Sequence, residues 1–262
     1  MKKIFALCSV MFFVFFAAGI SDAAPSDDLK AAYANMRNIK NGRLVFNLTG
    51  HIFNKEAKLT VNSDFALRPK FAATGEIKLA KKNYTFFIED SYNSYTLSYK
   101  ENKDKNWKKN TFKKEDFDRQ QNPDMKVIDK LRHFKGYRAD NEAVDFKGGK
   151  YYVKIDPNKI VAAITEIVKR HSKDEERIER TKRLFSGLSP LTAEIRLDKD
   201  GLIREGKLEL TPLIKEIKEK VASDDKIDKK TKRLVATAFS DATIKFTLSD
   251  INNVEVVRPS NE

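Results

Sequence analysis

The stretch Arg43-Leu44-Val45-Phe46-Asn47-Leu48-Thr49 alternates apolar and polar side chains with a period of two residues. In an extended strand, successive side chains point to opposite faces, so Leu44, Phe46 and Leu48 share one face and the polar residues share the other. The pattern predicts a β-strand with one buried face and one solvated face.

The same alternation returns four times between residues 55 and 101. Asn, Gly, Lys and Asp clusters separate the runs at intervals of roughly ten residues, which is typical of strands joined by tight turns. The stretch therefore predicts an antiparallel meander with one apolar and one polar face. Its further apolar members are Leu59, Val61, Ile77, Leu79, Tyr84, Phe86, Ile88, Tyr95, Leu97 and Tyr99.

Helices are predicted on both sides of this meander. Leu29, Ala32, Tyr33 and Met36 recur at helical spacing, which predicts a helix over residues 26–39 with Ser26 as its N-cap. A second helix is predicted over residues 123–134. Further strands are expected around 142–146 and 151–155, and a hairpin with Lys199-Asp200-Gly201 at its turn.

The C-terminal half contains two similar segments. Residues 160–184 align without gaps on residues 210–234, and each copy predicts a pair of amphipathic helices, at about 157–188 and 212–239. Thr211 stands before Pro212, as a capping residue stands before a proline at the first helical position. Duplication and shared Lys- and Glu-rich composition both explain the similarity.

The N-terminus has the order of a secretory signal peptide. Positive residues Lys2 and Lys3 precede an apolar run over 4–20, and small residues up to Ala23 offer a cleavage site. We expect cleavage near Ala23, with a retained membrane anchor as the alternative. Residues 24–262 then form a single exported domain without cysteine, in the periplasm, the cell envelope or the extracellular space, because Cys8 lies in the apolar run.

The chain is strongly basic, with 51 Lys and Arg against 38 Asp and Glu and a net charge of +13. Such a surplus attracts anionic surfaces. Outside the cytoplasm these are lipid headgroups, which make up the membrane surface, and envelope polymers. We expect no nucleic acid partner, because acidic and basic residues are interspersed and no helix has a purely basic face.

No catalytic pattern is evident. The histidines His51, His133 and His171 lie in different predicted elements, and none has a second histidine or a cysteine at metal-ligand spacing. Nucleophile elbow, phosphate-loop and dinucleotide patterns are also missing from the sequence. We therefore expect a protein that is not an enzyme, without a metal site or cofactor.

Four segments carry a resemblance to a known family: Trp107-Lys108-Lys109, Tyr151 to Pro157, Ile195 to Ile203, and Phe246 to Val254. Together with the order of elements, they resemble the LolA-like and LppX-like bacterial envelope proteins and lipoproteins. The resemblance implies an α+β fold, in which a curved antiparallel sheet forms a half-open β-barrel. Helices pack across its open side and enclose an apolar cavity.

The sequence departs from that family in two places. No cysteine closes the apolar run, which argues against a lipid-tethered form. A helical insertion over residues 213–239 precedes the last strand, and it would cover the cavity or fill it.

The resemblance directs attention to two sets of residues. The predicted cavity is lined by Phe46, Leu48, Phe86, Ile88, Leu97 and Tyr99, and a basic rim is formed by Lys105, Trp107, Lys108 and Lys109. The first hypothesis is a carrier or sensor that holds a lipid or other amphiphile in this cavity. The alternative is a basic envelope protein with a filled core, which docks on anionic polymer, a membrane surface or a protein partner.

Overall fold

The computed structural model describes residues 27–36, 38–113, 144–155, 179, 183 and 186–259. The predicted signal peptide, the helix predicted over 123–134 and almost all of the helical pair predicted over 157–188 lie outside these residues. The chain forms two compact units, residues 1–36 with 120–206 and residues 37–119 with 207–262.

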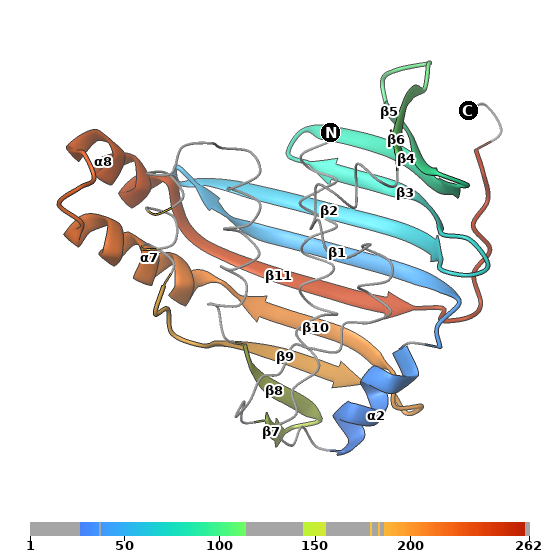
Figure 1. Cartoon of the computed structure of the whole chain (residues 1–262), viewed down its shortest axis with the longest axis horizontal. Coiled ribbons are helices and arrows are strands. Elements are labelled where there is room, and N and C mark those ends of the chain that lie inside the picture. Colours follow the sequence, from blue (N-terminus) through green and yellow to red (C-terminus); the bar gives the residue numbers. More distant parts are fainter. Residues whose placement is uncertain are drawn as a thin grey trace. The chain divides into compact units, whose positions relative to one another are not determined.

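The larger unit is built on an antiparallel meander of six strands. These are β1 (Asn41–Ile52), β2 (Lys55–Ala66), β3 (Ala72–Leu79), β4 (Lys82–Ser91), β5 (Ser94–Glu101) and β6 (Lys108–Lys113). Each pairs with the next along the chain. The last strand, β11 (Phe239–Ser249), pairs with the free edge of β1, so the end of the chain returns to the start of the meander (Figure 1).

The register places the apolar residues of neighbouring strands side by side. Phe46 of β1 lies opposite Val61 of β2 and Phe246 of β11. Directly opposed residues of an antiparallel pair point to the same face, so rows of apolar side chains cross this sheet. Figure 1 shows the sheet curving within the unit, since β1 and β2 run across the view whereas β5 and β6 run steeply up it.

The polar face of this sheet is covered locally by the C-terminal segment. Val254 donates its N–H to Asn41 Oδ1 at 3.0 Å, which holds the segment beside β1. Further on, Arg258 binds Glu89 at 3.1 Å, and its guanidinium lies 5.8 Å from the centre of the Phe87 ring. Phe87 is only 3% exposed although it belongs to the polar face.

Two helices precede β11. Helix α7 spans Thr211–Ser223 and helix α8 spans Lys229–Ala238, where the sequence predicts a helical pair. Asp228 accepts hydrogen bonds from the N–H and hydroxyl of Thr231 at 2.9 and 2.6 Å, which satisfies a backbone donor at the start of α8. These bonds lower the pKa of Asp228.

The smaller unit contains helix α2 (Asp27–Met36), strands β7 (Val144–Lys147), β8 (Lys150–Ile155) and β9 (Leu191–Leu197), and the start of β10 (Ile203–Glu209). Tyr151 of β8 donates its hydroxyl to Asp28 of α2 at 3.2 Å. The buried residues of α2 are Leu29, Ala32, Tyr33 and Met36, the set that the helical spacing predicts.

The predicted turn between β9 and β10 is confirmed. Asp198 Oδ1 accepts the N–H groups of Asp200 and Leu202, each at 2.9 Å, and its Oδ2 lies 2.6 Å from Nε of Arg204. Gly201 has φ +70°, a left-handed conformation that glycine adopts without strain.

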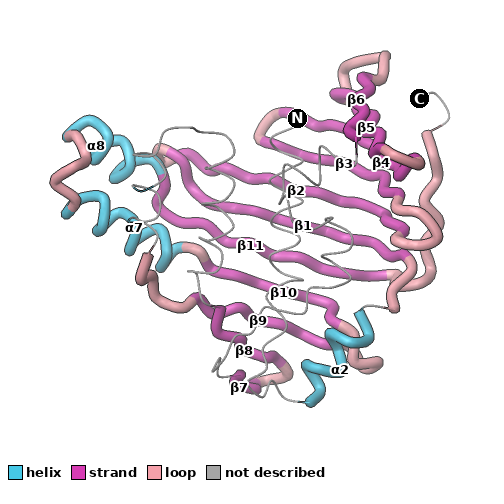
Figure 2. The backbone as a smooth tube through the Cα atoms, in the orientation of Figure 1, coloured by secondary structure: helices cyan, strands magenta, loops and turns pink. Residues whose placement is uncertain are grey.

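The strand order β6-β5-β4-β3-β2-β1-β11-β10-β9-β8-β7 makes one antiparallel sheet of eleven strands. Its end strands β6 and β7 do not pair with each other, so the described sheet is not closed (Figure 2). The predicted fold class, a large unclosed antiparallel sheet with few helices, is confirmed. Among the described helices, none has the length and apolar character needed to span a bilayer.

The structure differs from the sequence-based predictions in three places. The lysine-rich stretch after β5 contains strand β6, which was not predicted. Helix α2 ends at Met36, before the predicted end at residue 39. Thr211 is the first residue of α7 instead of its cap, because Leu210 occupies the N-cap position and makes no capping bond through its side chain.

Candidate apolar binding face

All six residues of the predicted cavity lie on one face of the larger unit's sheet. Ile88 is paired with Leu97 and Phe86 with Tyr99 across β4 and β5, while Phe46 and Leu48 alternate along β1. The register across β2 and β3 connects these positions in rows, for example Phe46–Val61–Ile77. We call this side of the sheet the apolar face.

The six residues form two groups on the apolar face. Phe86, Ile88, Leu97 and Tyr99 are immediate neighbours on β4 and β5. Phe46 is on β1, three strands from β4, which is about 14 Å at the usual strand spacing. The structure therefore brings four of the six together and places Phe46 and Leu48 at a distance that a long acyl chain can span.

The rows between these two groups contain apolar residues that the site prediction did not include. Those between the groups come from β2 and β3, where the sequence signal was the same alternation that defined the strands, and β11 adds more on the far side of β1. The added residues are Leu59, Val61, Phe65, Ile77, Ile244, Phe246 and Leu248.

Burial varies over the apolar face. Phe46, Phe86 and Leu97 are 3%, 3% and 1% exposed, whereas Leu48 and Tyr99 are half-buried. Ser63, a polar member of the face, donates its hydroxyl to the backbone carbonyl of Thr74 at 3.1 Å. A buried hydroxyl satisfied in this way adds little polarity, so the face suits an apolar occupant.

Charged residues of the apolar face stand at the ends of its strands. Lys82 begins β4 and binds Glu101 at 3.4 Å, and Lys108 begins β6 and binds Asp104 at 3.0 Å. The attraction of Glu101 raises the pKa of Lys82, and the hydrogen bond to Asp104 raises that of Lys108. Both ammonium groups therefore stay charged at neutral pH.

The predicted basic rim is split between a loop and a strand. Lys105 and Trp107 lie in the connection between β5 and β6, where Lys100 Nζ stands 5.1 Å from the Trp107 ring centre. Lys108 is opposite Tyr99 on the apolar face, whereas Lys109 is opposite Ser98 on the polar face. Only part of the rim can thus meet a ligand on the apolar face.

The described residues contain no cluster of three His, Cys, Asp or Glu side chains that would hold a metal. The arrangement nearest to a catalytic one is His51 with Asp241, whose Nδ1 and Oδ2 atoms lie 2.9 Å apart. Ser240 donates its hydroxyl to the same carboxylate instead of to the imidazole. Since a serine nucleophile needs a histidine base on its hydroxyl, this exposed trio does not make a catalytic site. The hydrogen bonds that Asp241 accepts, chiefly the one from Ser240, lower the pKa of this carboxyl group.

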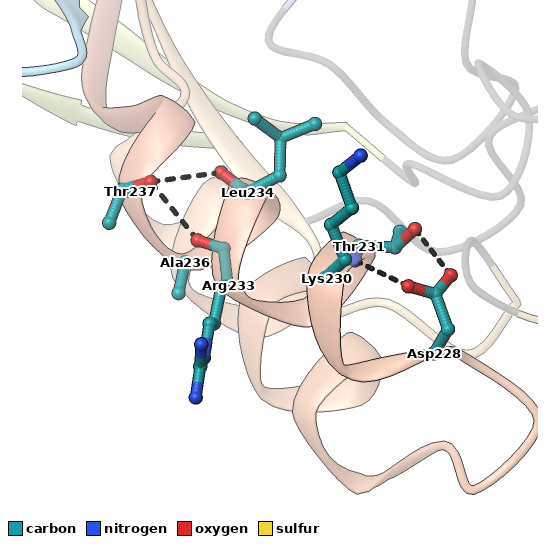
Figure 3. A pocket seen from close by; sticks show the side chains of 7 residues that line it. All are labelled: Asp228, Lys230, Thr231, Arg233, Leu234, Ala236 and Thr237. Atoms are coloured by element: carbon teal, nitrogen blue, oxygen red, sulfur yellow. Dashed lines mark hydrogen bonds between the residues drawn. The ribbon is translucent and has the colours of Figure 1, made fainter.

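A separate depression of about 730 Å³ lies on helix α8, away from the predicted cavity residues (Figure 3). Its lining combines cationic and apolar side chains, and the Asp228 carboxylate is occupied by its bonds to Thr231. The lining residues are Asp228, Lys230, Thr231, Arg233, Leu234, Ala236 and Thr237.

Comparisons with known proteins add a structural likeness. No protein-family model matches the chain, and no curated protein matches it. Among solved structures, the chain is similar to the crystal structure of LprF from Mycobacterium bovis, with 14% sequence identity and a TM-score of 0.40. The match covers 90% of this chain and 99% of LprF.

Proposed function

We propose that this chain is an exported protein without enzymatic activity that holds a lipid or other amphiphile against the apolar face. The observation that carries the proposal is the register, which gathers Phe86, Ile88, Leu97 and Tyr99 on one face and continues it through Val61 and Ile77. Apolar surface of this extent, with charges only at its margin, suits an acyl chain with a polar head.

The charged residues at the margin of the apolar face suit the headgroup of such a ligand. In the row that runs from Phe86 through Tyr99, the next residue is Lys108. An acyl chain along this row would place its headgroup beside an ammonium group. The proposed ligand is therefore an amphiphile with an anionic head, and the lysine supplies the charge that orients it.

The test is native mass spectrometry with lipid extraction on the chain purified from its own cells. A lipid that co-purifies reproducibly should be lost in Leu97→Trp, which forces a large side chain into the apolar face. The matched control is Thr96→Trp, since Thr96 is the neighbouring residue on the polar face. Because overpacking costs about 1–3 kcal/mol, thermal unfolding of both variants shows whether they remain folded.

The outcome distinguishes two functions. Loss of the lipid in Leu97→Trp alone supports the carrier and identifies its cargo. A wild-type protein that carries no lipid and takes up none when lipids are added contradicts it.

The burial of residues on the apolar face favours a second function, in which the core is filled. Phe46, Phe86 and Leu97 are each at most 3% exposed, as in a fully packed core. A filled core would leave the basic surface as the functional feature, and the protein would act by docking on an anionic surface or partner. In that case both tryptophan variants would be lipid-free, and only Leu97→Trp would lose stability.

A further inference from the structure

Apolar and cationic side chains meet at one end of the larger unit. Ile52 ends β1 and Phe53 begins the turn to β2, and the two side chains are 39% and 52% exposed. Phe53 donates its N–H to the carbonyl of Ala238, the last residue of α8, at 2.9 Å. Leu234, one helical turn before Ala238, is 54% exposed. Three large exposed apolar side chains thus surround one hydrogen-bonded junction.

Cations lie along the helix that ends at this junction. Helix α8 carries Lys229, Lys230, Lys232 and Arg233 in ten residues and has no acidic residue, so the expectation that no helix has a purely basic face is wrong for α8. Lys55 stands just beyond the turn. Lys55, Lys229, Lys230 and Arg233 are exposed, and among the described residues none of the four takes part in an ion pair.

We name this surface the basic apolar tip, made of Ile52, Phe53, Lys55, Lys229, Lys230, Arg233 and Leu234. Figure 3 shows Lys230 and Leu234 projecting from one side of α8 and Arg233 from the other.

The backbone presents Phe53 at a conformational cost. Phe53 and Asn54 have φ of +50° and +60°, the left-handed pair of a tight hairpin turn. Glycine and asparagine usually occupy such positions, and a bulky residue there is an outlier. A strained position that carries an exposed phenylalanine indicates that the side chain has a use outside the fold.

We propose that the basic apolar tip docks on the surface of an anionic phospholipid bilayer. Exposed phenylalanine and leucine beside lysine and arginine are the composition of segments that lie in the membrane interface. The apolar side chains would enter the headgroup boundary, and the cations would bind acidic lipid heads. An anionic polymer would bind the cations and leave Phe53 and Leu234 in water. A bilayer would contact both the cations and the apolar side chains, so it fits the basic apolar tip better.

The topology places further cations at the same end of the strands. In an antiparallel meander, alternate connections leave at the same end. The β3–β4 turn with Lys81 therefore leaves its strands at the end where the β1–β2 turn does, whereas the β5–β6 connection with Lys103 and Lys105 follows strands that turn steeply away in Figure 1. The net charge of +13 adds a long-range attraction between the protein and an anionic bilayer.

The test is flotation of residues 24–262 with vesicles of phosphatidylcholine containing about 30% phosphatidylglycerol, compared with pure phosphatidylcholine. Omitting residues 1–23 removes the apolar run, which would bind any bilayer. We expect binding to the anionic vesicles only, and release at about 0.5 M salt.

Two double variants test the apolar and the cationic residues of the basic apolar tip separately. Phe53→Ser with Leu234→Ser should weaken binding by about tenfold through lost apolar contact. Lys230→Glu with Arg233→Glu should weaken it by at least about tenfold through lost attraction to acidic heads. All four residues are exposed, so thermal unfolding should be almost unchanged.

Matched controls come from the opposite end of β2. Leu67→Ser removes a side chain that is 44% exposed, and Lys70→Glu reverses an exposed charge, and both should bind as the wild type does. Failure of the wild type to bind anionic vesicles would overturn the proposal. So would unchanged binding by Phe53→Ser with Leu234→Ser, which would reduce the surface to a binder of polyanions. The result does not depend on whether the protein carries a lipid.

Discussion

Phe86 of β4 lies directly opposite Tyr99 of β5, and on its other side it lies opposite Gly75 of β3. The row therefore passes from a position without a side chain to two aromatic rings and then to Lys108. This sequence of glycine, aromatics and cation across four strands is the feature that makes the apolar face a candidate for an amphiphile.

Phe86 should be important for stability. Phe86→Ala removes a ring that is 3% exposed and leaves a cavity, so the free energy of unfolding should fall by about 3–5 kcal/mol. Urea denaturation measures this difference. Phe53→Ala is the matched control, because its ring is 52% exposed and its removal should cost less than about 1 kcal/mol. Equal losses in the two variants would show that Phe86 is not part of the core.

Gly75 should resist substitution. A Cβ at this position would collide with the backbone of Asn62 on the adjacent strand. Gly75→Ala should therefore force the strands apart and lower the free energy of unfolding by about 1–3 kcal/mol. Thr247→Ala, on the exposed side of β11, should stay within about 0.5 kcal/mol of the wild type. A Gly75→Ala protein as stable as the Thr247→Ala protein would show that the backbone of Asn62 does not approach Gly75 this closely.

Asp198 should make stability depend on pH in the acid range. Partial burial alone would raise the pKa of Asp198, but hydrogen bonds from Leu202, Arg204 and Asp200 outweigh it and lower the pKa below its ordinary value. The charged form therefore favours the folded state. Its contribution is complete above the unfolded pKa of about 3.9 and is lost as the pH falls through the lower, folded pKa.

Asp198→Asn isolates this contribution. The variant should be less stable than the wild type by about 1–3 kcal/mol at pH 7, and the difference should shrink below about pH 4. Chemical denaturation at several pH values measures it, with Asp200→Asn as an exposed control in the same turn. A difference that stays constant down to pH 2 would mean that the carboxylate charge does not stabilise the turn.

Arg258 should hold the C-terminal segment over Phe87. Arg258→Ala removes an ion pair with Glu89 and a cation–π contact, both partly exposed, so the loss should be about 1 kcal/mol and smaller at high salt. Hydrogen exchange at β4 should rise in the variant. Val257→Ala, whose side chain is 64% exposed, should leave exchange unchanged. Unchanged exchange in Arg258→Ala would mean that the segment is held without this side chain.

Local pattern predicted much of the sheet. The alternation around Phe46 and around Leu97 was sufficient to place β1 and β5 and to assign both residues to one face, because a period of two fixes which side chains share a side. Strand β6 was missed because lysine and asparagine surround Phe112, its one large apolar residue, and such residues have low strand preference.

The alternation of apolar and polar residues does not predict which distant strands pair. Nothing in the sequence around Phe246 indicates that β11 pairs with β1, about 200 residues earlier, since strand partners are chosen by the whole sheet. The exposed position of Phe53 was also missed. Phe53 lies in a turn whose left-handed backbone the residue type does not suggest.

The most direct test of the account uses the absence of cysteine from residues 24–262. Tyr99→Cys and Lys100→Cys place a single thiol on the apolar and on the polar face, at two neighbouring half-buried positions. Each is labelled with a small fluorophore and titrated with a fatty acid that carries a spin label on its acyl chain, which quenches fluorescence at short range. We predict saturable quenching of the label at position 99 and little at position 100. Equal quenching at both positions, or none at either, would contradict an acyl chain held against the apolar face.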